Sequence, residues 1–159
     1  MRVIFLDSLF RFKLILLFSP PIPLQTMINT IELEFATIRI YENLIVTECN
    51  EGVLLDVPKN RKVLELAGEV FNNEAFGYIS NRINSYAVDP MVYREAAAHP
   101  QLKAIAVVSE NELARSSAKL EKQFYTNKNP FQIFSSLEEA KIWIREIMAH
   151  QSKKESANW

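Results

Sequence analysis

The chain has 159 residues, which is enough for one domain with a substantial core but marginal for two. Apolar residues make up 48% and charged residues 23% of it, and this composition excludes an intrinsically disordered chain. The net charge of −1 provides no basic field. Because nucleic-acid binders use such a field to neutralise phosphates, we expect no nucleic-acid partner.

Glycine and cysteine are both scarce. The only glycines are Gly52, Gly68 and Gly77, so neither a phosphate-binding loop nor a dinucleotide-binding fingerprint is present. Cys49 is the single cysteine, which excludes an intrachain disulfide and fits a reducing, cytoplasmic location. It lies in the apolar run LIVTEC, a setting typical of a buried, inert thiol.

Residues 1–26 differ in character from the rest of the chain. They are basic and apolar, but Arg11 and Lys13 interrupt the apolar run and three prolines follow it. The run is too short for a membrane span and lacks a signal-peptide cleavage site. We expect either a start assigned too far upstream, with Met27 as the true first residue, or a targeting or membrane-surface segment.

The first predicted elements are a strand pair and a helix. FATIRIY, within 34–41, alternates apolar and polar residues as a half-buried strand does, and LIVTEC pairs with it after a turn at 42–43. Apolar residues then recur at helical spacing over 57–72, with Asp56 as the cap and Pro58 in the first turn.

Strands and helices alternate over the remainder of the chain. We predict strands at 75–80, 102–109 and 131–134, and helices opening at Asp89-Pro90, over 111–125 and after a capping box of Ser135 with Glu138 or Ser136 with Glu139. The strand at 102–109 is the most apolar and is therefore predicted to be central. The order β-β-α-β-α-β-α-β-α predicts an α/β domain over 27–150, with a small mixed sheet of four or five strands and about four helices, and a flexible tail over 151–159.

Catalytic and metal-ligating patterns are missing from the sequence. The two histidines, His99 and His150, have no other ligand at metal-site spacing. His99 ends a predicted helix, where a protonated ring would suit the helix dipole. We expect no catalytic residue, no metal and no cofactor. An enzyme using Glu48, Glu51 or Asp56 is a further class, although nothing in their spacing pairs them.

The polar segment 81–90 is the candidate interaction surface. It follows a strand and precedes a helix, and open α/β sheets place their functional surface at the carboxyl ends of their strands. The candidate residues are Asn84, Ser85, Tyr86, Asp89 and Arg94. Tyr86 and Tyr125 are expected to be exposed because they lie in loop-like stretches, and Asp89 can also cap the helix.

The element order and three stretches, KAIAVVSEN-ELAR, NKNPFQIF and SSLEEAKIWI, resemble the STAS/SpoIIAA-like family over residues 32–148. The resemblance implies a four- or five-stranded sheet with helices and a regulatory or ligand-binding role without catalysis. Antagonists in that family carry a phosphorylatable serine at the start of the helix after the third strand. Val88 and Asp89 stand there in this chain, so the phosphorylation switch is not expected.

Two functions follow as expectations. The first is a non-enzymatic module that binds a protein partner through the segment 81–90 and the adjacent helix. The alternative is a carrier or sensor of a small apolar ligand or lipid, which would need an apolar pocket in place of a filled core. Self-association as a homodimer is a further alternative.

Overall fold

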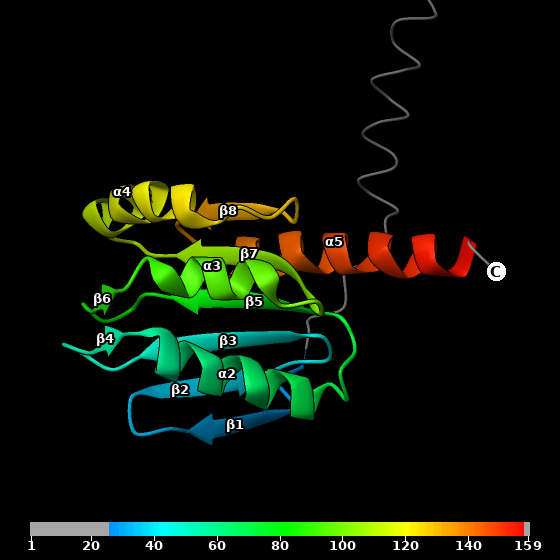
Figure 1. Ribbon diagram of the computed structural model, residues 1–159, viewed down its shortest axis with the longest axis horizontal. Coiled ribbons are helices and arrows are strands. Elements are labelled where there is room, and N and C mark those ends of the chain that lie inside the picture. Colours follow the sequence, from blue (N-terminus) through cyan, green and yellow to red (C-terminus); the bar gives the residue numbers. More distant parts are fainter. Residues whose placement is uncertain (1–25, 158–159) are drawn as a thin grey trace, which may run out of the picture.

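The computed structural model describes residues 26–157, so the segment preceding the domain lies, except for its last residue, outside the described residues. A six-stranded mixed sheet runs through the molecule (Figure 1). Its strands, in spatial order, are β1 (Asn29–Glu32), β2 (Ala36–Ile40), β3 (Leu44–Cys49), β5 (Phe76–Asn81), β7 (Leu102–Val108) and β8 (Phe131–Phe134). The first three strands are antiparallel neighbours, and β3, β5, β7 and β8 are parallel. A separate two-stranded sheet joins β4 (Leu54–Leu55) to β6 (Ala87–Val88).

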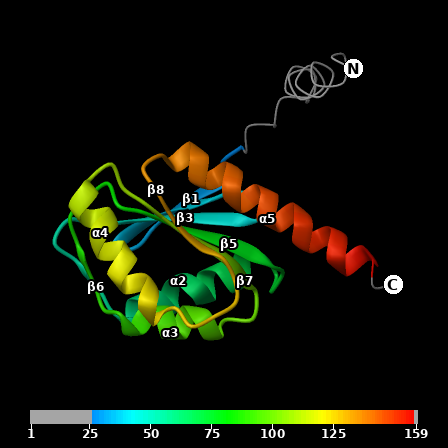
Figure 2. The same cartoon turned by 90° about the horizontal axis from the view of Figure 1, so that it is seen from above.

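Helices cover both faces of the sheet (Figure 2). The crossovers between parallel strands contain α2 (Val57–Val70), α3 (Met91–Ala98) and α4 (Glu112–Glu121), the last followed by a 3₁₀ turn, η1 (Lys122–Phe124). Because successive crossovers of one hand advance along the sheet in one direction, these three helices lie on the same face. After β8 the chain reverses to the other face, where α5 (Leu137–Ala157) packs on β5, β7 and β8.

The two faces bury separate cores. On the face of α2, α3 and α4, apolar side chains of the sheet pack against Val63 and Leu64 of α2 and Val92 of α3. On the opposite face, Ala140 and Ile144 of α5 are fully buried. Gly77 lies beneath Ile144 at so close a distance that a Cβ built on this glycine would come within 2.3 Å of Ile144 Cγ2.

The predicted helix signals are confirmed. The carboxylate of Asp56 accepts the Lys59 N–H at 3.1 Å and caps α2, and proline occupies its first turn. Of the two alternative capping residues before α5, Ser136 accepts the Glu139 N–H, at 3.4 Å. The last helix continues to Ala157, through most of the stretch expected to be a tail.

The expected sheet of four or five strands was too small. The missed strand, β1, has the sequence NTIE and lies largely exposed at the edge, so it shows no apolar alternation. The strand at 102–109 was predicted to be central, which is wrong, because β3 and β5 are the middle pair and β7 lies between β5 and β8. Among the helices of residues 26–157, none is long and apolar enough to cross a membrane.

Candidate functional site

The carboxyl ends of β3 and β5 carry two loops that are fastened to each other. The segment 50–56 follows β3, and the segment 82–90 follows β5. The Gly52 N–H donates to the Ser85 carbonyl at 2.8 Å, and the Ser85 N–H donates to the Glu51 carboxylate at 2.7 Å. Two further backbone bonds, from the N–H groups of Ala87 and Asp89 to carbonyls of the first loop, form the β4–β6 sheet. We call the two loops together with the first turn of α3 the carboxyl edge.

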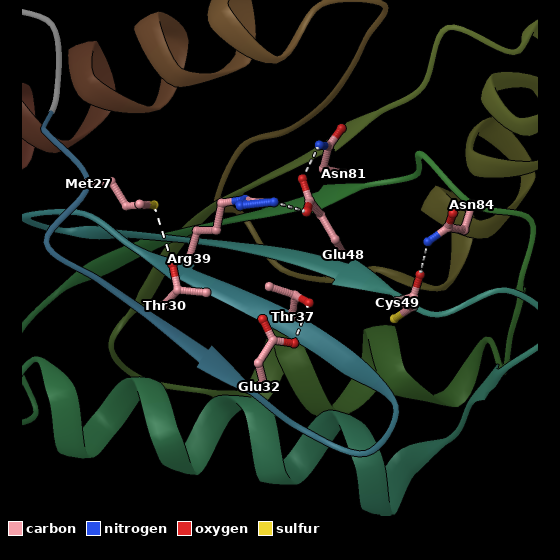
Figure 3. A network of polar contacts seen from close by, with 9 residues as sticks. All are labelled: Met27, Thr30, Glu32, Thr37, Arg39, Glu48, Cys49, Asn81 and Asn84. Carbon is pink, nitrogen blue, oxygen red and sulfur yellow. Dashed lines mark hydrogen bonds and ion pairs between the residues drawn. The ribbon is translucent and has the colours of Figure 1, made fainter.

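The polar groups of Asn84 and Ser85 serve this connection. The Asn84 amide donates to the Cys49 carbonyl at 2.9 Å, which fixes the second loop to the end of β3 (Figure 3). Ser85 uses its backbone N–H and carbonyl in the contacts above, and the residue is exposed. Both residues were predicted to contact a partner. In the structure, the Asn84 amide forms a hydrogen bond within the chain.

Tyr86 was predicted to be exposed, and this is wrong. Its hydroxyl forms a 2.6 Å hydrogen bond with the Ser80 hydroxyl, and its ring faces the Arg82 guanidinium, 5.6 Å from the ring centroid. Burial raises the pKa of the Tyr86 phenol to about 12, so the hydroxyl stays protonated. Tyr86 is partly buried, and Tyr125 is buried against Phe131, contrary to the prediction.

A buried ion pair lies behind Tyr86. Arg82 donates from Nη1 and Nη2 to the two carboxylate oxygens of Glu121 on α4, at 3.1 and 2.5 Å. The Tyr93 hydroxyl donates to the same carboxylate at 2.6 Å and accepts from Arg82 at 3.0 Å. Burial opposes the charge on Arg82, but the hydrogen bonds to Glu121 raise the pKa of the guanidinium. The cluster joins the carboxyl edge to α3 and α4.

Sequence reasoning missed Arg82, although a signal was present. Tyr78, Ser80 and Arg82 alternate along one face of β5 and its extension, and that face carries the three crossover helices. An arginine at the next alternate position points its side chain toward the same buried face, and a buried charge requires a partner. The partner lies 39 positions further along the chain, so local patterns do not identify it.

A small cavity lies between α2, α3 and the sheet. Its volume is about 20 Å³, and the residues with polar side chains that line it are Asn60, Tyr78, Ser80, Arg82 and Tyr93. A cavity of this size holds about one water molecule. Within the described residues, Nε of Arg82 has no hydrogen-bond partner.

Asp89 and Arg94 flank the start of α3. The Asp89 carboxylate accepts the Met91 N–H at 2.9 Å, so the predicted capping contact is present. Arg94 is exposed on α3. His99, which ends this helix, packs edge-on against Phe76. Burial lowers the pKa of its imidazole, so the expected protonated cap is disfavoured.

Apolar side chains are exposed around the carboxyl edge. Leu54 is 51% exposed, Ile83 64% and Met91 46%. Leu54 pairs with the exposed Ala87 across the β4–β6 sheet, whereas the following pair, Leu55 with Val88, is less exposed. The small sheet therefore presents an apolar outer face beside the first turn of α3.

A polar groove of about 510 Å³ adjoins Ile83, where β5, β7 and β8 end. Asn111, which caps α4, and the first residues of α5 line it, and the two helices depart to opposite faces of the sheet. Glu110 and Glu138 contribute carboxylates to its wall. These charges oppose an anion at the two helix N-termini, so the groove is not built for phosphate.

The carboxylates considered for catalysis have separate structural partners. Glu48 accepts from Arg39 and from the Asn81 amide, both at 2.7 Å (Figure 3). These contacts lie on the face of the sheet opposite to α2, α3 and α4. Glu51 holds the Ser85 N–H, and Asp56 caps α2. The structure does not bring these three side chains together as an acid–base pair.

The described residues contain no group of three His, Cys, Asp or Glu side chains that could hold a metal ion. Comparisons of the chain with protein-family models, with curated proteins and with solved structures found no match.

Proposed function

We propose that the chain is a non-enzymatic, STAS-like interaction module that binds a protein partner at the carboxyl edge. The observation that carries this proposal is the apolar outer surface of two loops that are fastened to each other. Leu54 and Ile83 project from them into solvent, as does Met91 in the first turn of α3. Exposed apolar side chains gathered at one edge of a sheet are typical of an interaction site.

The bonding between the loops supports a binding role. The contacts of Gly52, Ser85, Ala87 and Asp89 fix both loops before any partner arrives. A surface held in its bound shape loses little conformational entropy on association, so more of the contact energy contributes to affinity. The structural roles of Asn84 and Tyr86 fit this view, since both residues bond the second loop of the carboxyl edge to the strands of the sheet.

The Cys49 thiol supports a role without nucleophilic catalysis. Burial raises the pKa of this thiol to about 11, so at neutral pH it is protonated and a poor nucleophile. The same edge lacks a hydroxyl at Val88 and Asp89, where antagonists of the STAS family would carry their serine. Partner binding in this proposal is therefore constitutive and is not switched by phosphorylation at that position.

Site-specific photo-crosslinking in the producing cell tests the proposal. A photoreactive amino acid at Leu54 or Met91 should give a discrete adduct with another protein. The same group at Glu65, exposed on α2, serves as the matched control. Adducts of equal yield from all three positions, or none from the edge, would contradict the proposal.

The alternative function, carriage of a small apolar ligand or lipid, requires a much larger interior space. Ligand pockets have volumes of about 300–1,000 Å³. The cavity beneath α3 has about 20 Å³. Carriage would therefore require α3 to move away from the sheet. Native mass spectrometry of the full chain from its own cells distinguishes the two functions, because only a carrier would retain a lipid-sized adduct.

A further inference from the structure

Helix α4 and the turn η1 expose their largest apolar side chains. Leu113 is 78% exposed, Leu120 65% and Phe124 38%. Leu113 and Leu120 are separated by seven positions and therefore share one face of α4, and Phe124 follows in η1. We call this face the α4 stripe. An apolar face at helical spacing that is turned to solvent indicates a docking surface.

Other side chains attach α4 to the domain. The only buried residue of α4 is Ala118, which packs against the core, and Glu121 holds the buried Arg82. Arg115 donates from Nη1 to the carbonyls of Ser109 and Glu110, at 2.7 and 2.8 Å. The leucines of the stripe are therefore not needed to attach the helix.

The residues around the stripe make it complementary to itself. Ser116 and Ser117 lie midway between the two leucines, and such small side chains allow two helices to approach closely. On one flank, Glu112 stands near the start of α4 and Lys119 near its end. Two such helices placed antiparallel bring each glutamate beside the other helix's lysine. A parallel arrangement would place the charged flanks of the two helices on opposite sides of the contact, so these pairs could not form.

We infer that the α4 stripe binds a second copy of this chain, with the two α4 helices antiparallel about a twofold axis near Ser116 and Ser117. Leu113 of each copy packs against Leu120 of the other, and two Glu112–Lys119 pairs flank the contact. Such an isologous arrangement closes on itself and yields a dimer without further growth. This inference stands independently of the partner proposed for the carboxyl edge.

The size of the α4 stripe determines how strong the self-association is expected to be. Twelve helical residues span about 18 Å, so the contact is smaller than a standard interface of about 800 Å² per partner. A reversible dimer with a dissociation constant of about 10–100 µM is expected. Sedimentation velocity of the full chain from about 5 to 500 µM covers this range.

Charge-swap variants test the arrangement. Glu112→Lys and Lys119→Glu should each weaken self-association by about 10-fold or more, because each places like charges across the axis twice. An equimolar mixture of the two variants should recover association, since unlike charges face each other again. Lys62→Glu and Glu65→Lys, both exposed on α2, are matched controls that should leave association unchanged.

Leu120→Ser provides the apolar test and should raise the dissociation constant by about 100-fold, because the leucine is buried twice in the dimer. Circular dichroism should show the same fold for all variants. A chain that stays monomeric to 500 µM would overturn the inference. So would association that is insensitive to Leu120→Ser, or a charge-swap mixture that remains monomeric.

Discussion

The guanidinium of Arg82 and the carboxylate of Glu121 form a buried ion pair that connects the end of β5 to α4. The two side chains are 6% and 15% exposed, and the Tyr93 hydroxyl bonds to both of them. This pair therefore holds together the carboxyl edge and the helix that carries the α4 stripe.

Removing one partner of this pair should strongly destabilise the fold. Arg82→Met leaves the Glu121 carboxylate buried without its counterion, and we expect a loss of about 3–5 kcal/mol in the free energy of unfolding. Arg82→Met combined with Glu121→Met should lose less than the single Arg82→Met variant, because no charge then remains buried. Urea unfolding followed by circular dichroism measures both.

Arg61→Met is the matched control for that series. Arg61 pairs with Glu95 at 2.8 Å, but its side chain is 59% exposed, so the expected loss is at most about 1 kcal/mol. Equal losses for Arg61→Met and Arg82→Met would show that burial of the Arg82 pair does not determine its contribution.

The buried thiol of Cys49 should make stability fall in alkaline solution. Burial raises its pKa from 9.0 to about 11, so the unfolded chain releases this proton at a lower pH than the folded one. The contribution of the protonated thiol is fully present below pH 9 and is lost as the pH rises from 9 toward 11. Between pH 8 and 10, the wild type should lose more unfolding free energy than Cys49→Ala. Parallel pH dependence of the two proteins would contradict this assignment.

The contact between Gly77 and Ile144 should make even a single added methyl group destabilising. Gly77→Ala places a Cβ 2.3 Å from Ile144 Cγ2, and overpacking of this kind costs about 1–3 kcal/mol. Ile144→Ala should offset part of that loss when the two changes are combined. Gly68→Ala, in α2, meets only the flexible end of Asn73 at 3.4 Å and serves as the control. It should be neutral or stabilise by up to about 1 kcal/mol. Thermal and urea unfolding would measure all four variants.

Much of the fold could be predicted from local patterns. The strand pair at β2 and β3, the cap at Asp56 and the alternation of strands and helices are each encoded in neighbouring residues. β1 could not be found in this way, because an exposed edge strand has no apolar alternation and forms through its pairing with β2. The prediction that β7 is the central strand was also wrong. The spatial order of strands depends on the direction of the crossovers and not on the hydrophobicity of one strand.

The location of the segment 81–90 after β5 could be predicted, but the contacts of its side chains could not. Its position after β5 follows from the rule for open sheets, and the exposed Ile83 and Met91 lie within it or beside it. The roles of Asn84 and Tyr86 depend on Cys49 and Ser80, to which the fold brings them. Leu54 was missed because β4 has only two residues and contacts β6 through a pairing across 33 positions.

The most direct test of the central proposal is the affinity of the cross-linked partner for surface variants of the full chain. Leu54→Asp combined with Met91→Asp should weaken binding by at least about 100-fold, because both changes place charge in an apolar contact. Leu120→Ser, on the α4 stripe, should leave this affinity within about twofold of the wild type. If the edge variant bound as tightly as the wild type while Leu120→Ser lost binding, the carboxyl edge would not be the partner site.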